Sequence, residues 1–289
     1  MRYDIAIIGS GPAGLSAAVN AKIRNKSFII FGNKSLSTKI EKAHSIDNYL
    51  GFYNISGEDL KRHFIDHIES MDIQIDEHKI TNVYAMGDYF TLVSGSEMFE
   101  ATTVILAIGT DSAKSIEGEE TFLGRGVSYC ATCDAPLYRG KDVCVLGYNE
   151  ESIHEANFLN EIAQKTYFIP MRNTIKKDLS LINSEIEVID KKPTEIQGEM
   201  LVNKLNFQDE SLDIDGVFII KDSMSPKNLV PGLELNGEHI KVDVNMKTNI
   251  EGLFACGDCV GRPYAYLKSA GQGLTAALNA VEYIAKKSK

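Results

Sequence analysis

The N-terminal strand runs directly into a glycine-rich turn, and this stretch restricts the fold more than any other. Residues 4–8 are mostly apolar, Gly9-Ser10-Gly11-Pro12-Ala13-Gly14 follows, and residues 15–21 are helix-like. A strand, G-x-G-x-x-G and a helix together form the dinucleotide-binding fingerprint. Its first glycine allows the tight turn, its second lets the backbone approach a pyrophosphate, and its third lets helix and strand pack closely. We therefore predict a Rossmann-type α/β unit at the N-terminus.

Three further stretches extend this unit. The predicted strand 28–31 ends in Gly32-Asn33, although an acidic ribose-binding residue is expected about 20 residues beyond the fingerprint. The apolar strand 102–110 closes on a glycine turn, and residues 252–258 end in Gly257-Asp258 ahead of a glycine-rich helical segment. Asp258 suits either a ligand hydroxyl or a helix N-cap, because both lie at such a strand end.

The central part of the chain carries a C-x-x-C pair, Cys130 and Cys133, with Asp134 directly behind it. Next to a βαβ pattern in an intracellular-looking chain, this spacing indicates a redox dithiol rather than a structural disulfide. Asp134 is suited to donate and accept the proton that each sulfur exchanges. The alternative for Asp134 is a turn or helix-cap residue.

A second C-x-x-C pair, Cys256 and Cys259, has three interpretations. Two such pairs form a four-thiolate zinc site in some proteins, a second pair can be another redox dithiol, and buried cysteines often serve packing alone. We favour packing, because the motifs around both pairs already explain their positions. Cys144 lies in the apolar run 143–146 and is predicted to be a core residue.

Composition limits the remaining possibilities. The 289 residues allow one large domain or two ordinary ones. A net charge of −10 argues against nucleic acid as a partner, because phosphate binding needs a basic surface. No apolar run approaches the roughly 18 residues of a membrane span, and no signal-peptide pattern precedes the first strand. We therefore expect a cytoplasmic protein that binds no membrane.

Five motifs together resemble the low-molecular-weight thioredoxin reductases over essentially the whole chain. They are Gly9–Gly14, Asp47–Phe52, Leu106–Gly109, Cys130–Asp134 and Leu253–Asp258. The resemblance implies FAD as cofactor, a homodimer, and an α/β fold with two three-layer Rossmann-like domains, the second inserted in the first. The FAD-binding domain would comprise residues 1–110 and 237–289, and residues 111–236 would form a central disulfide domain. Hinges for domain rotation are expected near 110–112 and 233–237.

The resemblance also implies which residues bind FAD. Asn48 would lie near the flavin, Asp258 on the ribityl chain and Ile80 at the adenine. The complete predicted set is Gly9, Ser10, Gly11, Pro12, Ala13, Gly14, Phe31, Gly32, Ile40, Asn48, Ile80, Ala107, Gly109, Gly257, Asp258, Ala265 and Tyr266. No metal is implied.

The second nucleotide turn departs from this family. The family's central domain binds NADPH, but here Gly147 is followed by Tyr148 and Asn149, then by Glu150-Glu151. Side chains at this turn would occupy the space of a pyrophosphate, and the two carboxylates would compete with phosphate for the helix N-terminus. The basic residues after the following strand are reduced to Arg172 and Lys176 within 170–176. We expect the βα unit to fold and not to bind a nucleotide.

Tyr264-Ala265-Tyr266 replaces a further family motif before the last helix, and Tyr266 would either stack on the flavin or pack in the core. Together these departures resemble a narrower family, the ferredoxin-dependent flavin thioredoxin reductases. That resemblance implies electron flow from ferredoxin through FAD and the Cys130–Cys133 disulfide to thioredoxin. Two alternatives stay open: an NAD(P)H-dependent thioredoxin reductase with a divergent nucleotide site, and a flavin redox sensor without turnover.

Overall fold

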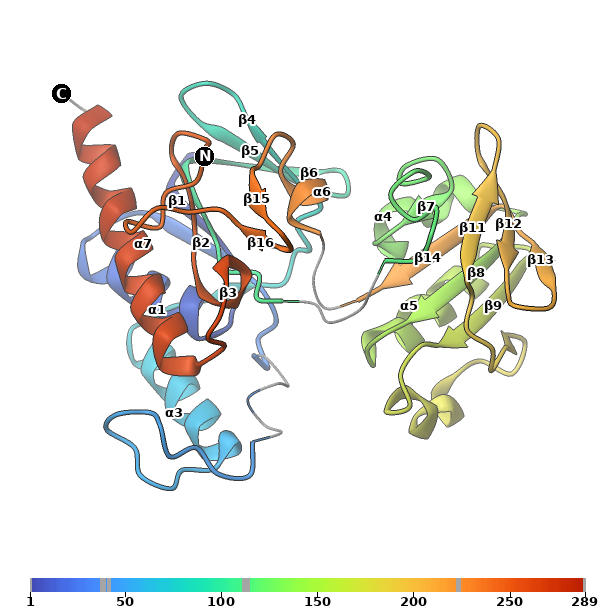
Figure 1. Cartoon of the computed structure of the whole chain (residues 1–289), viewed down its shortest axis with the longest axis horizontal. Coiled ribbons are helices and arrows are strands. Elements are labelled where there is room, and N and C mark those ends of the chain that lie inside the picture. The colour runs from blue at the N-terminus through green and yellow to red at the C-terminus, as the bar shows by residue number, and fades with distance from the viewer. Residues whose placement is uncertain (1, 37–39, 41–42, 111–114, 222–224, 288–289) are drawn as a thin grey trace. The chain divides into compact units, whose positions relative to one another are not determined.

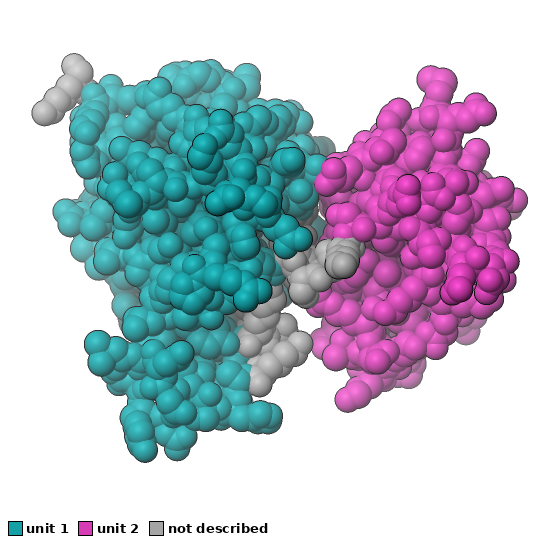
Figure 2. Space-filling view, in the orientation of Figure 1, with its two compact units in different colours: residues 1–110, 225–289 teal, residues 111–224 magenta. Residues whose placement is uncertain are grey.

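The chain folds into two compact units. The computed structural model describes residues 2–36, 40, 43–110, 115–221 and 225–287, and for Cys133 the backbone alone. The first unit comprises Met1–Thr110 and Ser225–Lys289, and the central unit comprises Asp111–Met224 (Figure 2).

The first unit is built on a seven-stranded sheet with the order β3-β2-β1-β6-β5-β4, in which β17 also pairs with β6 (Figure 1). Neighbouring strands among β1, β2, β3, β6 and β17 pair in parallel, while β4–β5 and β5–β6 are antiparallel pairs. The strands are β1 (Arg2–Ile8), β2 (Phe28–Phe31), β3 (Ile75–Asp76), β4 (Asn82–Ala85), β5 (Phe90–Ser94), β6 (Glu97–Leu106) and β17 (Leu253–Ala255).

Both faces of this sheet are buried, and β1 illustrates why. Ile5 and Ile7 pack on the face covered by helices, whereas Ala6 and Ile8 belong to the cluster on the opposite face. Successive side chains of a strand point to opposite faces, so a continuous apolar run is needed to bury both. The helices of this unit are α1 (Pro12–Ile23), α3 (Gly57–Ser70), α6 (Pro226–Leu229), α7 (Tyr266–Lys287) and the 3-10 turn η4 (Gly257–Val260).

Helices α1 and α7 lie side by side on one face of the sheet (Figure 1). Their contact consists of small buried residues, Ala17, Ala18 and Ala21 with Ala276, Ala277 and Ala280. A Cβ atom at Gly273 would collide with the backbone of Ala13. The glycine therefore lets α7 approach the first turn of α1 closely.

The chain returns to the first unit earlier than the sequence suggests. The contact division falls at Ser225 rather than near Gly237. Leu229, Val230 and Leu233 are buried in a core cluster of the first unit, because α6 contacts β4. The expected hinge at 233–237 thus falls within the first unit by this contact division, and the expected hinge at 110–112 lies mainly outside the described residues.

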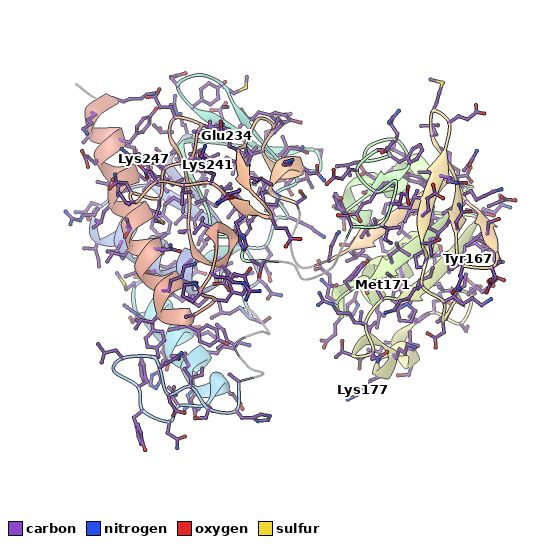
Figure 3. The ribbon with its side chains drawn as sticks, in the orientation of Figure 1. Tyr167, Met171, Lys177, Glu234, Lys241 and Lys247 are labelled. Carbon is purple, nitrogen blue, oxygen red and sulfur yellow. The ribbon has the colours of Figure 1, made fainter. Side chains whose placement is uncertain are left out.

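A short hairpin follows this return. Strands β15 (Leu235–Asn236) and β16 (His239–Ile240) pair antiparallel. Glu234 and Lys241, which are labelled in Figure 3, flank the hairpin and form an ion pair of 2.8 Å. The hairpin thus forms a local unit that packs through Ile240 into the same core cluster.

The central unit has a five-stranded, wholly parallel sheet with the order β10-β9-β8-β14-β7. Its strands are β7 (Val127–Ser128), β8 (Asp142–Gly147), β9 (Lys165–Pro170), β10 (Glu187–Val188) and β14 (Gly216–Ile220), and a separate antiparallel sheet contains β11 (Glu195–Gly198), β12 (Val202–Asn206) and β13 (Ser211–Asp213). Its helical segments are α4 (Ala131–Asp134), η1 (Ala135–Tyr138), α5 (Glu151–Asn160), η2 (Ile175–Lys177) and η3 (Leu179–Leu181).

The core of the central unit repeats the two-faced pattern of the first. Val143 and Val145 of β8 pack on one face, and Cys144 and Leu146 pack on the other. Cys144 is fully buried and free, as expected for a core residue, and burial raises the pKa of its thiol. Across the described residues of both units, no helix combines the length and apolar character that a membrane span needs.

Candidate functional site

The first glycine turn leaves a space beside the N-terminus of α1. Gly9 has a φ of 115°, and a Cβ atom there would collide with the carbonyl of Ala107. A Cβ atom at Gly14 would collide with the carbonyl of Gly9, whereas one at Gly11 would meet nothing within 4 Å. Gly11 is the N-cap of α1, which has no side-chain cap and no acidic residue in its first turn. Free backbone N–H groups at such a helix end suit a pyrophosphate.

Four parallel strands end together at this turn. Ile8 of β1 is in register with Phe31 of β2 and with Leu106 of β6, which is in turn in register with Ala255 of β17. The predicted residues that follow these strands are therefore neighbours, although they come from four parts of the chain. Ligands of open α/β sheets bind at this carboxyl edge.

The end of β2 is shaped for close backbone approach. A Cβ atom at Gly32 would collide with Ser10, whose hydroxyl donates to the carbonyl of Asn33 at 2.9 Å. The amide oxygen of Asn33 accepts from the backbone N–H of Ser35 at 2.7 Å. Ile40 and Ile80 are both buried; Phe31 shares a core cluster with Ile80.

The turn after β17 completes a group of close-packed glycine turns at this edge. We call this group the glycine cradle; it comprises Gly9, Gly11, Gly14, Gly32 and Gly257. A Cβ atom at Gly257 would lie 2.9 Å from the Cβ of Ala13, so only glycine fits against α1. The hydroxyl of Ser269 donates to Asp258 at 3.0 Å, and Lys268 Nζ donates to the carbonyl of Gly257 at 2.8 Å. The pKa of Lys268 is lowered, and burial of its side chain is the largest cause. Asp258 is thus held at the edge where a ribityl chain would pass.

Tyr266 begins α7 beside these groups. It packs half-buried against the cluster of Ile46, Ile55 and Leu60, in the segment that contains Asn48. Burial and the charge of Asp258 raise the pKa of Tyr266. Asn48 itself is exposed, and Ala265 precedes α7 with intermediate exposure.

The redox pair lies in the central unit. Cys130 follows β7, is disulfide-bonded and is 5% exposed. Cys133 lies in α4, but its side chain is outside the described part of the structure, so its pairing with Cys130 stays a prediction. The backbone N–H of Ala131 donates to the carboxylate of Glu155 on α5 at 2.7 Å. Asp134 accepts a hydrogen bond of 2.7 Å from the hydroxyl of Ser128.

These features agree with what comparison with known proteins gives. The family model of the pyridine nucleotide-disulphide oxidoreductases matches residues 3–281. The chain belongs to this family. A crystal structure of a ferredoxin-flavin thioredoxin reductase from Clostridium acetobutylicum is 54% identical with a TM-score of 0.95, covering 100% of this chain and 99% of its own.

Two further members of the disulphide oxidoreductase family are more distant. Thioredoxin reductase from Ureaplasma parvum is 32% identical over 98% of this chain and 97% of its own length. The structure of a thioredoxin reductase from Gloeobacter violaceus is 26% identical, with a TM-score of 0.85 over 100% of this chain and 96% of its own. The predicted fold class, the resemblance to the ferredoxin-dependent flavin thioredoxin reductases and FAD as the cofactor are confirmed. The glycine cradle of the first unit fits that cofactor.

The second glycine turn of this disulphide oxidoreductase is filled by side chains. A Cβ atom at Gly147 would collide with Ser152 and lie 2.6 Å from the Phe168 ring, which explains why this glycine remains. Tyr148, the next residue, is only 6% exposed and belongs to the core of the central unit. The guanidinium of Arg172 lies 5.9 Å from the centre of its ring.

A buried ion pair that the sequence analysis missed lies beside Tyr148. Lys221 Nζ is 2.6 Å from Glu119 Oε1, and their side chains are 7% and 1% exposed. The Tyr129 hydroxyl donates to the same carboxylate oxygen at 2.8 Å, and Lys221 Nζ lies 5.8 Å from the centre of the Tyr148 ring. The two charged residues are 102 positions apart, so no local pattern indicates their pairing.

Tyr148, Arg172 and Lys221 all follow the carboxyl ends of adjacent parallel strands. Gly147, the last residue of β8, is in register with Pro170 of β9 and with Ile220 of β14. This edge is where a nucleotide would bind in an open α/β sheet. In this protein a tyrosine ring and a buried ion pair occupy it.

The second C-x-x-C pair is a packing element. Cys256 and Cys259 are free thiols and are 0% and 2% exposed. The Cys259 thiol donates to the Cys256 carbonyl at 3.1 Å, and burial raises its pKa to about 12. A thiol that stays protonated is a poor nucleophile, so these features argue against a second redox dithiol.

Proposed function

We propose that this protein reduces thioredoxin with electrons from reduced ferredoxin, passed through FAD and a Cys130–Cys133 disulfide. The acceptor and the donor are taken from the Clostridium acetobutylicum relative, which is 54% identical over the full chain. The disulfide on Cys130 and the glycine cradle of the first unit are the groups that such a reaction needs.

One observation carries the choice of ferredoxin over a pyridine nucleotide. A pyrophosphate needs a glycine turn without side chains and with a positive helix end. The buried Tyr148 ring stands at this turn, and the charge of Lys221 is neutralised by Glu119. Displacing them would break a buried ion pair, which costs about 3–5 kcal/mol. The central unit therefore keeps the Rossmann architecture without a nucleotide site.

The electron balance agrees with this donor. Ferredoxin delivers one electron at a time, whereas a disulfide takes up two. When bound, FAD supplies a centre that accepts electrons singly and passes on a pair. An iron–sulfur donor at about −400 mV lies below a thioredoxin disulfide at about −270 mV, so the transfer runs downhill.

The chain's own residues then handle sulfur and protons. The Cys130–Cys133 disulfide takes up two electrons and two protons and becomes a dithiol. One thiolate attacks the thioredoxin disulfide to form a mixed disulfide, and the second thiolate releases the reduced partner, which restores the Cys130–Cys133 bond. In this proposal Asp134 holds the proton that passes to and from the sulfurs.

The deciding experiment is anaerobic stopped-flow mixing of the FAD-loaded protein with each donor. We expect reduced ferredoxin to bleach the flavin absorbance and NADPH to leave it unchanged over the same interval. Rapid bleaching by NADPH would refute the ferredoxin assignment. Sustained thioredoxin reduction under a continuous supply of reduced ferredoxin separates the enzyme from a flavin redox sensor, which would stop after one cycle.

Assembly and domain movement complete the proposal. We propose a cytoplasmic homodimer on the resemblance stated from the sequence. The same dithiol must meet both flavin and thioredoxin, so the central unit is expected to rotate about the two crossings near 110 and 225. A crosslink between the two units should leave flavin-to-disulfide transfer intact and stop thioredoxin turnover; unchanged turnover would count against rotation.

A further inference from the structure

Ser128 is a buried hydroxyl residue directly before the redox pair. It is the last residue of β7, paired in register with Phe218 of β14, and is 4% exposed. The sheet therefore fixes its backbone, and its side chain faces the segment that contains Cys130 and Asp134.

Three hydrogen-bond contacts connect this hydroxyl to that segment. The backbone N–H of Cys130 donates to Ser128 Oγ at 3.1 Å. Ser128 Oγ lies 2.7 Å from Asp134 Oδ2 and 3.2 Å from the carbonyl oxygen of Cys130. A hydroxyl has one proton and can donate to only one of these two acceptors at a time.

The protonation of Asp134 decides which acceptor is used. When Asp134 is a carboxylate, the Ser128 proton points to it, because a charged acceptor makes the stronger hydrogen bond. When Asp134 is protonated, its own O–H can donate to Ser128 Oγ, and the serine proton turns to the Cys130 carbonyl. Every polar group stays satisfied in both states, which a buried group requires.

We propose that Ser128 is the positioning residue of the proton-transfer step, holding Asp134 in both protonation states beside the dithiol. The proposal rests on the function above, in which Asp134 carries the proton. The Ser128 hydroxyl stabilises the carboxylate form of Asp134 by donating a hydrogen bond to it.

Charged and titratable groups lie on the elements around Asp134. Glu155 of α5 accepts from Ala131 in the same short helix. The pKa of Tyr138 in η1 is raised to about 12, first by burial and then by the negative charges of Asp134 and Asp215. Lys141 Nζ lies 5.4 Å from the centre of the Tyr138 ring. The Ser128 hydroxyl donates directly to Asp134.

The test is a single-turnover exchange between thioredoxin and protein that dithiothreitol has already reduced, measured from pH 5 to pH 9. In the plot of exchange rate against pH, one limb requires the Asp134 carboxylate. Ser128→Ala should shift this limb toward higher pH by about one unit, because about 1.4 kcal/mol of stabilisation of that carboxylate is lost. Ser128→Thr keeps the hydroxyl and should keep the wild-type profile. Wild-type circular dichroism and urea unfolding show that the central unit of each variant, which contains Ser128, is folded.

Asp134→Asn supplies the control. It should abolish that limb, and Ser128→Ala added to it should cause no further shift, because the two residues act as one unit. A wild-type profile for Ser128→Ala beside an altered Asp134→Asn would overturn the role of Ser128 alone. A wild-type profile for Asp134→Asn would overturn the proton role of Asp134 and this proposal with it. Chemical reduction bypasses the donor, so a failure of the ferredoxin assignment leaves this result interpretable.

Discussion

Two glycines of the first turn serve different purposes, although they are three residues apart. Gly14 is required by the fold, because its Cβ would collide with the carbonyl of Gly9. Among the described residues none requires a glycine at position 11, since its Cβ would meet nothing within 4 Å. We therefore propose that the open space at Gly11 accommodates the pyrophosphate of FAD.

This difference gives a first prediction. Gly11→Ala should fold normally and weaken FAD binding about tenfold, or about 1.4 kcal/mol, because the methyl group intrudes on the pyrophosphate. Gly14→Ala should lower the free energy of unfolding as well. Equilibrium dialysis with FAD and thermal unfolding measure the two effects. Gly271→Ala on α7, another glycine with an open Cβ position, is the control; an equal FAD loss there would contradict the assignment.

The Glu119–Lys221 pair supports a second prediction at the same scale. Lys221→Met leaves a carboxylate buried without its cation and should lower the free energy of unfolding by about 3–5 kcal/mol. The double variant Lys221→Met with Glu119→Gln removes both charges and should recover most of that loss. Urea unfolding followed by circular dichroism measures both. A double variant as unstable as the single one would mean that the loss comes from packing rather than from charge.

At the scale of elements, the sequence predicted local patterns well and long-range pairing poorly. The Gly9–Gly14 turn, its strand and its helix are all encoded within about twenty residues, so their physical reasons are visible in the chain. The buried contact of Lys221 with Glu119 has no such signal. Ser128 stands two residues before Cys130, yet serine is common in turns and strand ends, so only the structure reveals its hydrogen bonds.

The return to the first unit was missed for a related reason. Residues 233–237 contain polar residues and a glycine, which suggested a hinge. Leu229, Val230 and Leu233 nonetheless pack into the first core. Three apolar residues among polar ones indicate a strand or helix only when their partner is known, and here that partner lies far away in the sequence.

The β8–α5 connection yields a third prediction. Tyr148→Gly restores a glycine at the second turn but removes a buried ring, so the free energy of unfolding should fall by about 3–5 kcal/mol. NADPH should still fail to bleach the flavin, because the Glu119–Lys221 pair remains. Thermal unfolding and stopped-flow absorbance test the two parts. Tyr148→Phe keeps the ring and should retain most of the stability; rapid bleaching of the glycine variant would show that Tyr148 alone blocks the nucleotide.

At the scale of the whole molecule, the two units differ in how the chain builds them. The central unit is one continuous segment, Asp111–Met224, with core clusters on both faces of its sheet. The first unit needs two segments, because β17 and α7 come from the C-terminal part of the chain and β1, β6 and α1 from the N-terminal part. Its cradle therefore draws on both ends of the sequence.

This asymmetry gives a fourth prediction. A fragment of residues 111–224 should fold cooperatively and retain the disulfide on Cys130 without binding FAD, since it contains a complete parallel sheet and its helices. Circular dichroism, urea unfolding and a thiol count before and after denaturation test this. A fragment of residues 1–110 should stay unfolded alone. An unstructured central fragment would mean that its core depends on the first unit.

The position of β17 and α7 after the central unit in the sequence also determines the order of events on the ribosome. The segment that carries the dithiol emerges whole while the flavin-binding sheet still lacks one strand and the helix that covers its face. Domains fold as units during synthesis. The nascent chain therefore passes through a stage in which the central unit is folded and the apolar sheet of the FAD-binding unit is still incomplete. The enzyme therefore acquires its cofactor only after β17 and α7 have been synthesised.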